Sequence, residues 1–267
     1  MRVKNDKIMD RRDFIKKTAL ATAGAVMAAP VSAMMNKAES AGLLESNVTP
    51  AQKSSTEGKV PKVLLVNGSP RPDGNTFCCL KEIETQLQKH GVESEIVQIG
   101  RQSVRMCINC GGCRENGGEG CVFDDDLCSV ITGKMKEADA LIVGTPVYYG
   151  QPNGGLLSLM QRMFFSAGHL VQNKPAAALA VCRRGGATAA LQTMNMMFEM
   201  MNMPVVTSQY WNIAYGAGKG EVKLDTEGMQ TMRTLATNMA FLLEKIHAGG
   251  HPAPQRDERQ VFMNFIR

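Results

Sequence analysis

Four cysteines stand close together in the sequence, at a spacing that suits a metal centre. Cys107, Cys110, Cys113 and Cys121 follow the pattern C-x2-C-x2-C-x7-C. Two-residue gaps let successive thiolates point to a common centre, as they do around an iron-sulfur cube. In two-cluster ferredoxins such a run continues as x3-C-P, whereas here the fourth cysteine lies farther on and no second run exists. The spacing therefore predicts a single, locally closed [4Fe-4S] site.

Two other uses of these thiols stay open on the sequence alone. Cysteines of an exported chain can pair as disulfides. They can also bind zinc, although zinc sites more often use two separated C-x2-C pairs than three cysteines in succession. The remaining cysteines fall in predicted helices or at the end of a predicted strand, and are expected to be small buried side chains. They are Cys78, Cys79, Cys128 and Cys182.

A candidate anion site follows the first apolar run of the chain. Residues 68–76 read Gly-Ser-Pro-Arg-Pro-Asp-Gly-Asn-Thr and lead directly into a predicted helix. The N-H groups at the helix start, the hydroxyls of Ser69 and Thr76, and the side chains of Arg71 and Asn75 can all donate to a phosphate. No P-loop lysine motif and no G-x-G-x-x-G pattern is present, which favours one terminal phosphate, as in a mononucleotide. A Pro/Gly turn with a side-chain cap is the alternative.

Residues 1–33 predict a twin-arginine (Tat) signal peptide. Arg11 and Arg12 precede an alanine-rich apolar stretch over 19–29, and small residues at 31–33 offer a cleavage site. That stretch is too short to span a bilayer, and no other segment could do so. A cytosolic amphipathic helix is the alternative, but no periodic apolar stripe supports it. We therefore expect a periplasmic or otherwise exported chain without a membrane span in its mature form.

The charge balance argues against a nucleic-acid partner. The formal net charge is +5, but residues 1–33 hold seven Lys/Arg against three Asp/Glu, and the remainder holds 23 against 22. The near-neutral remainder shows no basic stripe with interleaved aromatic residues. Its histidines match no H-E-x-x-H motif, and no residue is predicted to be catalytic.

The elements that must position these motifs alternate along one predicted domain over 60–248. A linker is expected over 34–59 and a polar C-terminal tail over 249–267. Apolar runs separated by helical segments predict an α/β fold with a doubly wound five-stranded parallel sheet and helices on both faces, into which the four-cysteine loop 107–121 is inserted. The predicted strands are 62–67, 95–99, 139–144, 176–182 and 204–209, and the predicted helices are 75–90, a segment capped by the aspartates 124–126 and ending at 137, then 153–167, 187–202 and 226–247.

Taken together, these motifs resemble the flavodoxin-like NAD(P)H-dependent FMN reductases, specifically their iron-sulfur flavoprotein branch. The resemblance rests on the segment 68–76, on the cysteine loop followed by three aspartates, on Gly-Thr-Pro-Val-Tyr-Tyr-Gly at 144–150, and on segments 183–187 and 205–212. Four or more motifs occur in the expected order, and the resemblance covers roughly residues 60–246.

The resemblance implies an FMN site built from three loops. The first loop would hold the phosphate, the second would lie along the isoalloxazine ring, and the third would complete the ring site, although Gly-Gly after a strand can also be a simple turn. A homodimer or homotetramer is implied as well. The implied residues are Ser69, Arg71, Asn75 and Thr76 in the first loop, Pro146, Val147, Tyr148, Tyr149 and Gly150 in the second, and Arg183, Gly185 and Gly186 in the third.

The function implied is that of an FMN-dependent oxidoreductase that relays electrons between FMN and a [4Fe-4S] cluster. FMN exchanges electrons in pairs or singly, whereas a cluster exchanges one at a time. Two alternatives stay open, a non-catalytic electron carrier between redox proteins and a flavoprotein whose loop thiols sense redox state. Free nicotinamide nucleotides are not expected outside the cytoplasm, so export leaves the electron donor open, as a small molecule or as a protein.

Overall fold

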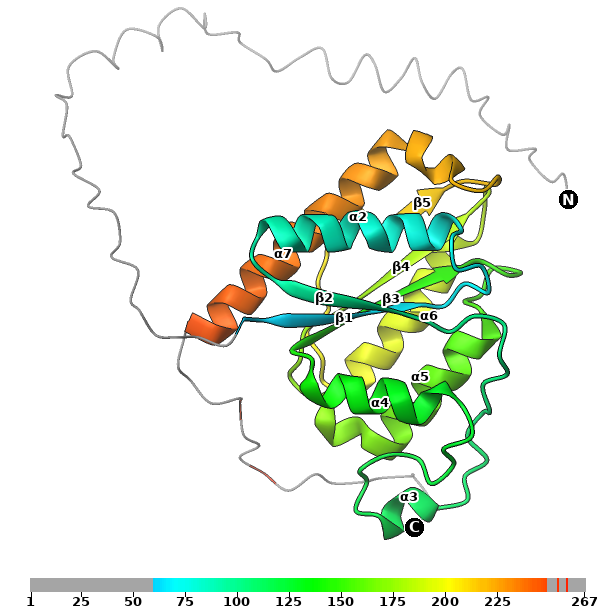
Figure 1. Cartoon of the computed structure of the whole chain (residues 1–267), viewed down its shortest axis with the longest axis vertical. Helices are drawn as coiled ribbons and strands as arrows, with labels where there is room; N and C mark the ends of the chain where they lie inside the picture. The colour runs from blue at the N-terminus through cyan, green and yellow to red at the C-terminus, as the bar shows by residue number, and fades with distance from the viewer. Residues whose placement is uncertain (1–59, 249–253, 255–257, 259–267) are drawn as a thin grey trace, which may run out of the picture. The chain divides into compact units, whose positions relative to one another are not determined.

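The computed structural model describes residues 60–248, 254 and 258 of the 267-residue chain (Figure 1). The predicted signal peptide 1–33, the predicted linker 34–59 and the rest of the predicted tail 249–267 lie outside the described residues. Within the described part, no helix is both long enough and apolar enough to cross a membrane.

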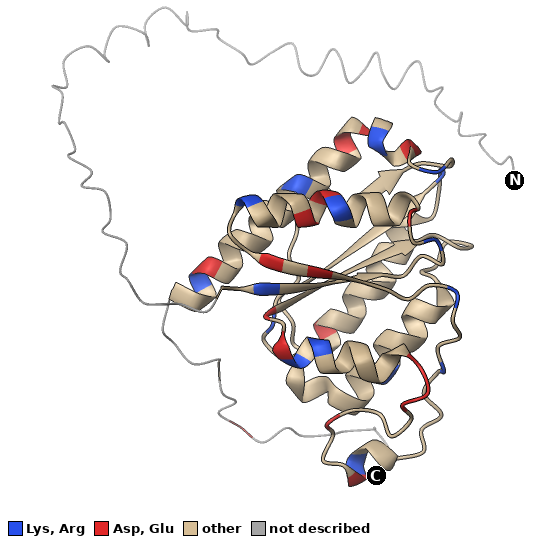
Figure 2. Cartoon of the chain, in the orientation of Figure 1, with Lys and Arg blue, Asp and Glu red and all other residues tan. Residues whose placement is uncertain are grey.

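Five parallel strands form one sheet in the order β2-β1-β3-β4-β5. Strands β3 and β4 contain no charged residue (Figure 2). They are also almost wholly buried. Both faces of such a sheet are covered, which is why these strands read as continuous apolar runs. The strands are β1 (Lys62–Asn67), β2 (Glu93–Gln98), β3 (Ala140–Pro146), β4 (Ala176–Cys182) and β5 (Ile213–Tyr215).

Helices cover both faces of this sheet (Figure 1). Alternate residues of β1 belong to two different cores: Leu64 and Val66 pack under one set of helices, and Val63 and Leu65 under the other. This arrangement and strand order confirm the predicted doubly wound, flavodoxin-like fold. One face carries α4 (Leu127–Glu137), α5 (Gly154–Ala167) and α6 (Ala187–Met200), and the other carries α2 (Asn75–Lys89) and α7 (Thr226–Ala248).

Short polar residues begin two of the helices that support the candidate sites. Asp126 caps α4 and accepts a hydrogen bond from the Cys128 N-H at 2.9 Å, as the aspartate run predicts. Asn153 caps α5 and accepts from the N-H of Gly155 at 2.9 Å. Helix α2 differs, because Gly74 precedes it and no side chain caps its first turn. Its leading N-H groups therefore face the loop before the helix without a side-chain partner.

The fifth strand was predicted in the wrong place. The segment 204–209 makes only an isolated bridge, between Val205 and Ala176, and β5 lies farther on at Ile213–Tyr215. The chain leaves the sheet edge between these points because the Thr207 carbonyl accepts a hydrogen bond from Asn238 of α7, at 2.8 Å, in place of a strand partner. The pairing with β4 resumes where the Ala180 N-H donates to the Asn212 carbonyl, at 3.0 Å.

The cysteine loop 107–121 lies between β2 and α4 and includes the short helix α3 (Gly112–Glu115). In Figure 1 it lies beyond α4 and α5, on their side of the sheet. Glu119 connects it to the body of the domain through Lys136, at 2.7 Å, and through His169, at 3.6 Å. Two 3-10 helices complete the described elements, η2 (Gly168–Leu170) after α5 and η3 (Glu221–Leu224) before α7.

Candidate functional site

A hollow of about 250 Å³ opens at the carboxyl ends of β3 and β4. It brings together eight residues predicted to bind FMN, namely Ser69, Arg71, Asn75, Thr76, Pro146, Val147, Tyr148 and Arg183. The hollow is also lined by residues that the sequence did not single out, Gly74, Val181, Cys182, Gly216 and Ala217. Sites for nucleotides in doubly wound sheets lie at this edge, so the position agrees with the chemistry predicted from the loops.

The lining of this hollow suits an anion. It contains two arginines, Arg71 and Arg183, and no carboxylate. Thr76 is 2% exposed and belongs to the uncapped first turn of α2, whose N-H groups carry partial positive charge. Burial raises the pKa of the Cys182 thiol, which keeps it neutral at physiological pH and so does not oppose a phosphate.

Hydrogen bonds from neighbouring residues hold the first predicted FMN loop, residues 68–76, in one conformation. We call it the phosphate loop. The Ser69 N-H donates to Oδ1 of Asn67 at 3.1 Å, and the Ser69 Oγ accepts from the Arg71 N-H at 3.1 Å. The Gln98 side chain at the end of β2 donates to the Ser69 carbonyl. These contacts fix the backbone of the loop before any ligand binds, which lowers the ordering cost of binding.

The segment 216–222, which follows β5, lies against the phosphate loop. Asn75 donates from Nδ2 to the Gly218 carbonyl at 2.9 Å and accepts from the Val222 N-H at 3.4 Å, while Lys219 pairs with Asp73. A Cβ on Gly216 would lie 2.7 Å from the Val222 nitrogen, so only glycine allows this approach. Asn75, predicted to bind the phosphate, lines the hollow and also holds residues 216–222 in place.

The second predicted FMN loop, residues 146–150, ends in a tight turn. We call it the ring loop. Tyr148 and Gln151 exchange two backbone hydrogen bonds, both at 2.9 Å, and the two residues between them have positive φ, 51° at Tyr149 and 77° at Gly150. This turn directs the Tyr149 side chain wholly into solvent. A Cβ on Gly186 would lie 2.8 Å from the Gly150 Cα, so the third predicted FMN loop, residues 183–186, contacts the ring loop there. Four predicted residues thus lie outside the hollow lining, namely Tyr149, Gly150, Gly185 and Gly186.

The four loop cysteines line one hollow. Cys107, Cys110, Cys113 and Cys121 share it with Arg162 and Phe165 of α5, among others. All eight cysteines are free thiols, and Cys79, Cys128 and Cys182 are buried as predicted, whereas Cys78 is half-buried. In the described part of the chain, no three His, Cys, Asp or Glu residues are grouped in a way that could hold a metal ion. The hollow measures about 20 Å³, little more than the space for one water, so a cluster would require the loop to spread.

The donor set and its surroundings nevertheless fit an iron-sulfur cluster. Four thiols face one space, as cluster ligands must, and no carboxylate or histidine lines that space. Arg162 also lines it, is 1% exposed, and has an Nε atom that is buried without a hydrogen-bond partner. A cluster with four thiolates is an anion rich in sulfur acceptors, which is the kind of group that a buried, unpaired N-H donor requires.

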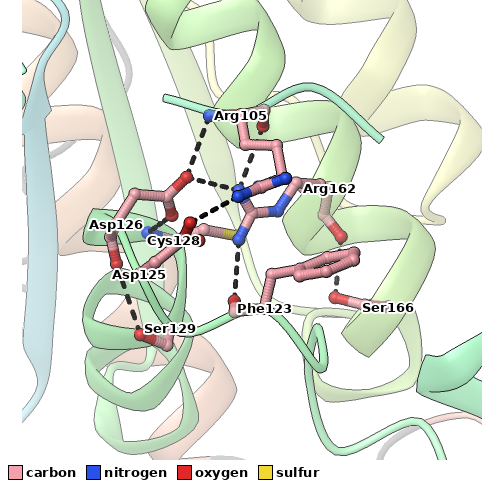
Figure 3. Close-up of polar contacts among 8 residues, drawn as sticks. All are labelled: Arg105, Phe123, Asp125, Asp126, Cys128, Ser129, Arg162 and Ser166. Carbon is pink, nitrogen blue, oxygen red and sulfur yellow. Dashed lines mark hydrogen bonds and ion pairs between the residues drawn. The ribbon is translucent and has the colours of Figure 1, made fainter. Parts of the chain in front are cut away.

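Arg162 is the centre of a polar network behind the cysteine loop (Figure 3). Its NH1 group lies 2.5 Å from Asp126 Oδ2, which also accepts from the Arg105 N-H at 2.9 Å. Burial alone would raise the pKa of Asp126, but the hydrogen bonds from Arg162, Cys128 and Arg105 outweigh burial and lower it below its ordinary value. The pair is therefore ionised at neutral pH. Arg162 was not predicted as a site residue, because its only signal in the sequence is a single cation among the apolar residues of α5.

Residues 61–218 match the profile of a protein family described as NADPH-dependent FMN reductase. The chain is 34% identical over 193 residues to an iron-sulfur flavoprotein of Methanocaldococcus jannaschii, an alignment that covers 69% of this chain and 98% of the relative. It is 32% identical over 194 residues to an iron-sulfur flavoprotein of Methanosarcina thermophila, covering 69% and 96%.

Solved structures support the fold. RosB, solved with bound 8-demethyl-8-formylriboflavin-5'-phosphate, has a TM-score of 0.58 at 17% identity and covers 77% of this chain and 92% of its own. FerB of Paracoccus denitrificans, a flavoenzyme NAD(P)H:(acceptor) oxidoreductase, has a TM-score of 0.52 at 16% identity, covering 70% and 99%. The family match and the relatives above, which extend over most of the described residues, show that this chain belongs to the NADPH-dependent FMN reductase family of flavoenzyme oxidoreductases, in its iron-sulfur flavoprotein branch.

Proposed function

We propose that this chain is an exported oxidoreductase that binds one FMN and one [4Fe-4S] cluster and connects two-electron with one-electron partners. The observation that carries the proposal is the presence, in one domain, of a carboxylate-free hollow with two arginines and of a second hollow lined by four thiols. When bound, FMN supplies paired or single electron exchange and the cluster supplies single exchange. The relatives' shared description as iron-sulfur flavoproteins supports both groups.

The protein's own residues bind and orient the flavin in this proposal. Ser69, Thr76 and the first turn of α2 donate to the phosphate, and Arg71 balances its charge. Pro146, Val147 and Tyr148 offer flat contact area to the ring, and Arg183 lies at the same hollow. Tyr148 and Tyr149 are both exposed, which leaves the ring side open to a small acceptor and favours an enzyme over a carrier with a covered flavin.

The thiolates of the cysteine loop would hold the cluster. Cys113 is buried, Cys107 and Cys121 are half-buried, and Cys110 is exposed, so one side of the site faces solvent. An exposed side gives a protein partner access for single-electron exchange.

Apolar side chains are exposed around the cysteine hollow. Those of Met106, Ile108 and Phe165 expose 65%, 54% and 52% of their surface. This apolar surface supports the proposed homodimer or homotetramer, which light scattering would test: a monomer mass would contradict it.

Export through the twin-arginine route is part of the proposal and rests on Arg11, Arg12 and the apolar stretch that follows. Substitution of both arginines by lysine is expected to keep the protein in the cytoplasm, as cell fractionation would show. Equal export of the wild type and the variant would remove the twin-arginine route from the proposal. A wild type that stays in the cytoplasm would remove export itself and restore NADPH as the expected donor.

Oxygen-free purification followed by cofactor analysis tests the central claim. We expect about four irons, matching acid-labile sulfide and one FMN per chain. A protein that contains FMN but neither iron nor sulfide, although it was never exposed to oxygen, would contradict the cluster and favour thiol chemistry in the cysteine loop. Iron without FMN would instead contradict the assignment of the phosphate hollow.

A further inference from the structure

Arg162 is the only charged residue among the described ones whose surface is almost wholly buried, at 1% exposed. Burial of a cation is costly unless other groups compensate its charge and satisfy its donors. The groups that do so here lie around the cysteine loop, not in the core of the sheet (Figure 3). Arg162 therefore serves that loop and not the packing of α5.

The guanidinium joins the two ends of the loop. NH1 donates to the Arg105 carbonyl at 3.0 Å, and NH2 donates to the Phe123 carbonyl at 2.9 Å. These carbonyls lie just before and just after the segment 107–121, which holds all four ligand candidates. One rigid fork thus closes the neck of the loop, which the single ammonium of a lysine could not do in the same geometry.

The charge of the guanidinium is offset by one carboxylate, and one of its N-H groups has no partner. Asp126 offsets its charge from one side, at 2.5 Å, while the exposed pair of Arg105 and Asp125 balances itself. Nε is buried without a partner, and Arg162 lines the hollow that the four thiols line. No carboxylate or histidine lines that hollow to accept the remaining N-H.

We propose that Arg162 closes the neck of the cysteine loop around the cluster and donates its Nε-H to a cluster sulfur, thereby raising the reduction potential of the cluster. The inference rests on the proposed iron-sulfur function. Addition of one electron makes a cluster with four thiolates more negative, so a fixed positive charge and an N-H donor beside its sulfurs stabilise the reduced form over the oxidised form. Arg162 acts on the cluster through its charge and this hydrogen bond, and it does not ligate iron.

Two substitutions with opposite expected signs test the inference on the anaerobically purified full chain. Arg162→Gln removes the charge, and we expect a lower midpoint potential of the cluster and faster release of iron to a chelator, with an unchanged FMN potential. Asp126→Asn removes the offsetting negative charge, and we expect a higher midpoint potential. Potentiometric titration followed by low-temperature EPR measures the midpoint potential of the cluster in both variants. A purely structural role for the network predicts iron loss in both variants without opposite shifts.

Arg105→Gln is the matched control, because it removes a neighbouring arginine side chain that pairs with Asp125 on the surface and leaves its backbone carbonyl in place. We expect a smaller shift than in Arg162→Gln. If Arg162→Gln does not load iron, Arg162→Lys replaces it, because lysine keeps the charge. The rate of iron release from Arg162→Lys and the midpoint potential of Asp126→Asn then test the inference. Unchanged potentials, or shifts of the same sign in the two test variants, would overturn the inference. Absence of iron from the wild type would instead overturn the proposed function.

Discussion

Single side chains decide what each hollow can bind. In the phosphate hollow, Thr76 contributes a hydroxyl at 2% exposure beside the uncapped start of α2. In the cysteine hollow, Arg162 contributes a buried N-H that has no partner. A buried donor without an acceptor is costly, so Arg162 gains a partner when an anion arrives. Thr76 lies instead at the positive end of α2, which also favours an anion. Both hollows thus favour negatively charged occupants.

Replacement of Thr76 by valine tests the phosphate assignment. Valine keeps the shape and removes the hydroxyl, and a hydrogen bond to a charged group contributes about 1.5–3 kcal/mol, so we expect FMN to bind about tenfold more weakly or worse. Riboflavin, which lacks the phosphate, should bind both proteins alike in a fluorescence titration. Thr85→Val is the control, because that exposed hydroxyl donates to the Lys81 carbonyl in the same helix. An equal loss for riboflavin would contradict the assignment.

The ionised Asp126 predicts an acid-dependent stability. Its pKa in the folded chain is lowered by hydrogen bonds that outweigh burial, so the folded value lies below the unfolded value of about 3.9. Its contribution is therefore complete above the unfolded pKa and is lost as the pH falls through the folded pKa. We expect Asp126→Asn to unfold in urea with about 3 kcal/mol less stability at neutral pH.

The same comparison at lower pH supplies the control. The difference between the wild type and Asp126→Asn should shrink below about pH 4, because protonation removes the same charge that the substitution removes. Both measurements use iron-free protein, so loss of a cluster does not contribute. A difference that stays constant down to the acid transition would show that the carboxylate charge is not what stabilises the network.

At the scale of elements, the parts that were predicted from sequence are those set by local patterns. The apolar run 62–67 and the capped start of α4 appear where predicted, because strand burial and capping depend on neighbouring residues. The parts that were missed depend on distant residues. Val205 and Val206 were predicted to lie in a strand, but the side chain of Asn238 donates a hydrogen bond to the carbonyl of the next residue, Thr207. Asn75 is predicted to bind the phosphate, and its amide also binds Gly218, a contact across 143 residues that local sequence does not reveal.

The loop 216–222 gives an element-scale prediction. Gly216→Ala would place a Cβ 2.7 Å from the Val222 nitrogen and 2.8 Å from Asn75 Nδ2, and such overpacking costs about 1–3 kcal/mol. We expect the loop to move away from the phosphate loop and FMN to bind about tenfold more weakly. Gly218→Ala in the same loop is the matched control, since its nearest contact would be an ordinary 3.6 Å. Equal FMN affinity in both variants would show that this loop does not support the site.

At the scale of the whole domain, α5 connects the two hollows. It begins just after the ring loop and carries Arg162 and Phe165 into the lining of the cysteine hollow. From Gly154 to Arg162 the helix rises about 12 Å, so a single rigid element fixes the position of one site relative to the other. Such a connection suits a protein in which both sites exchange electrons within the same chain.

The number of electrons that one chain accepts tests this view. The loaded wild type should take up about three electrons in an anaerobic dithionite titration, two at the flavin and one at the cluster. Cys110→Ala changes an exposed side chain, so the fold and the flavin should remain, and uptake should fall to about two. Cys78→Ala, a half-buried cysteine of α2 outside the cysteine hollow, should keep the wild-type count. If Cys110→Ala still accepted the wild-type number, the third electron would reside elsewhere than in the cysteine loop, and the two-site relay would have to be abandoned.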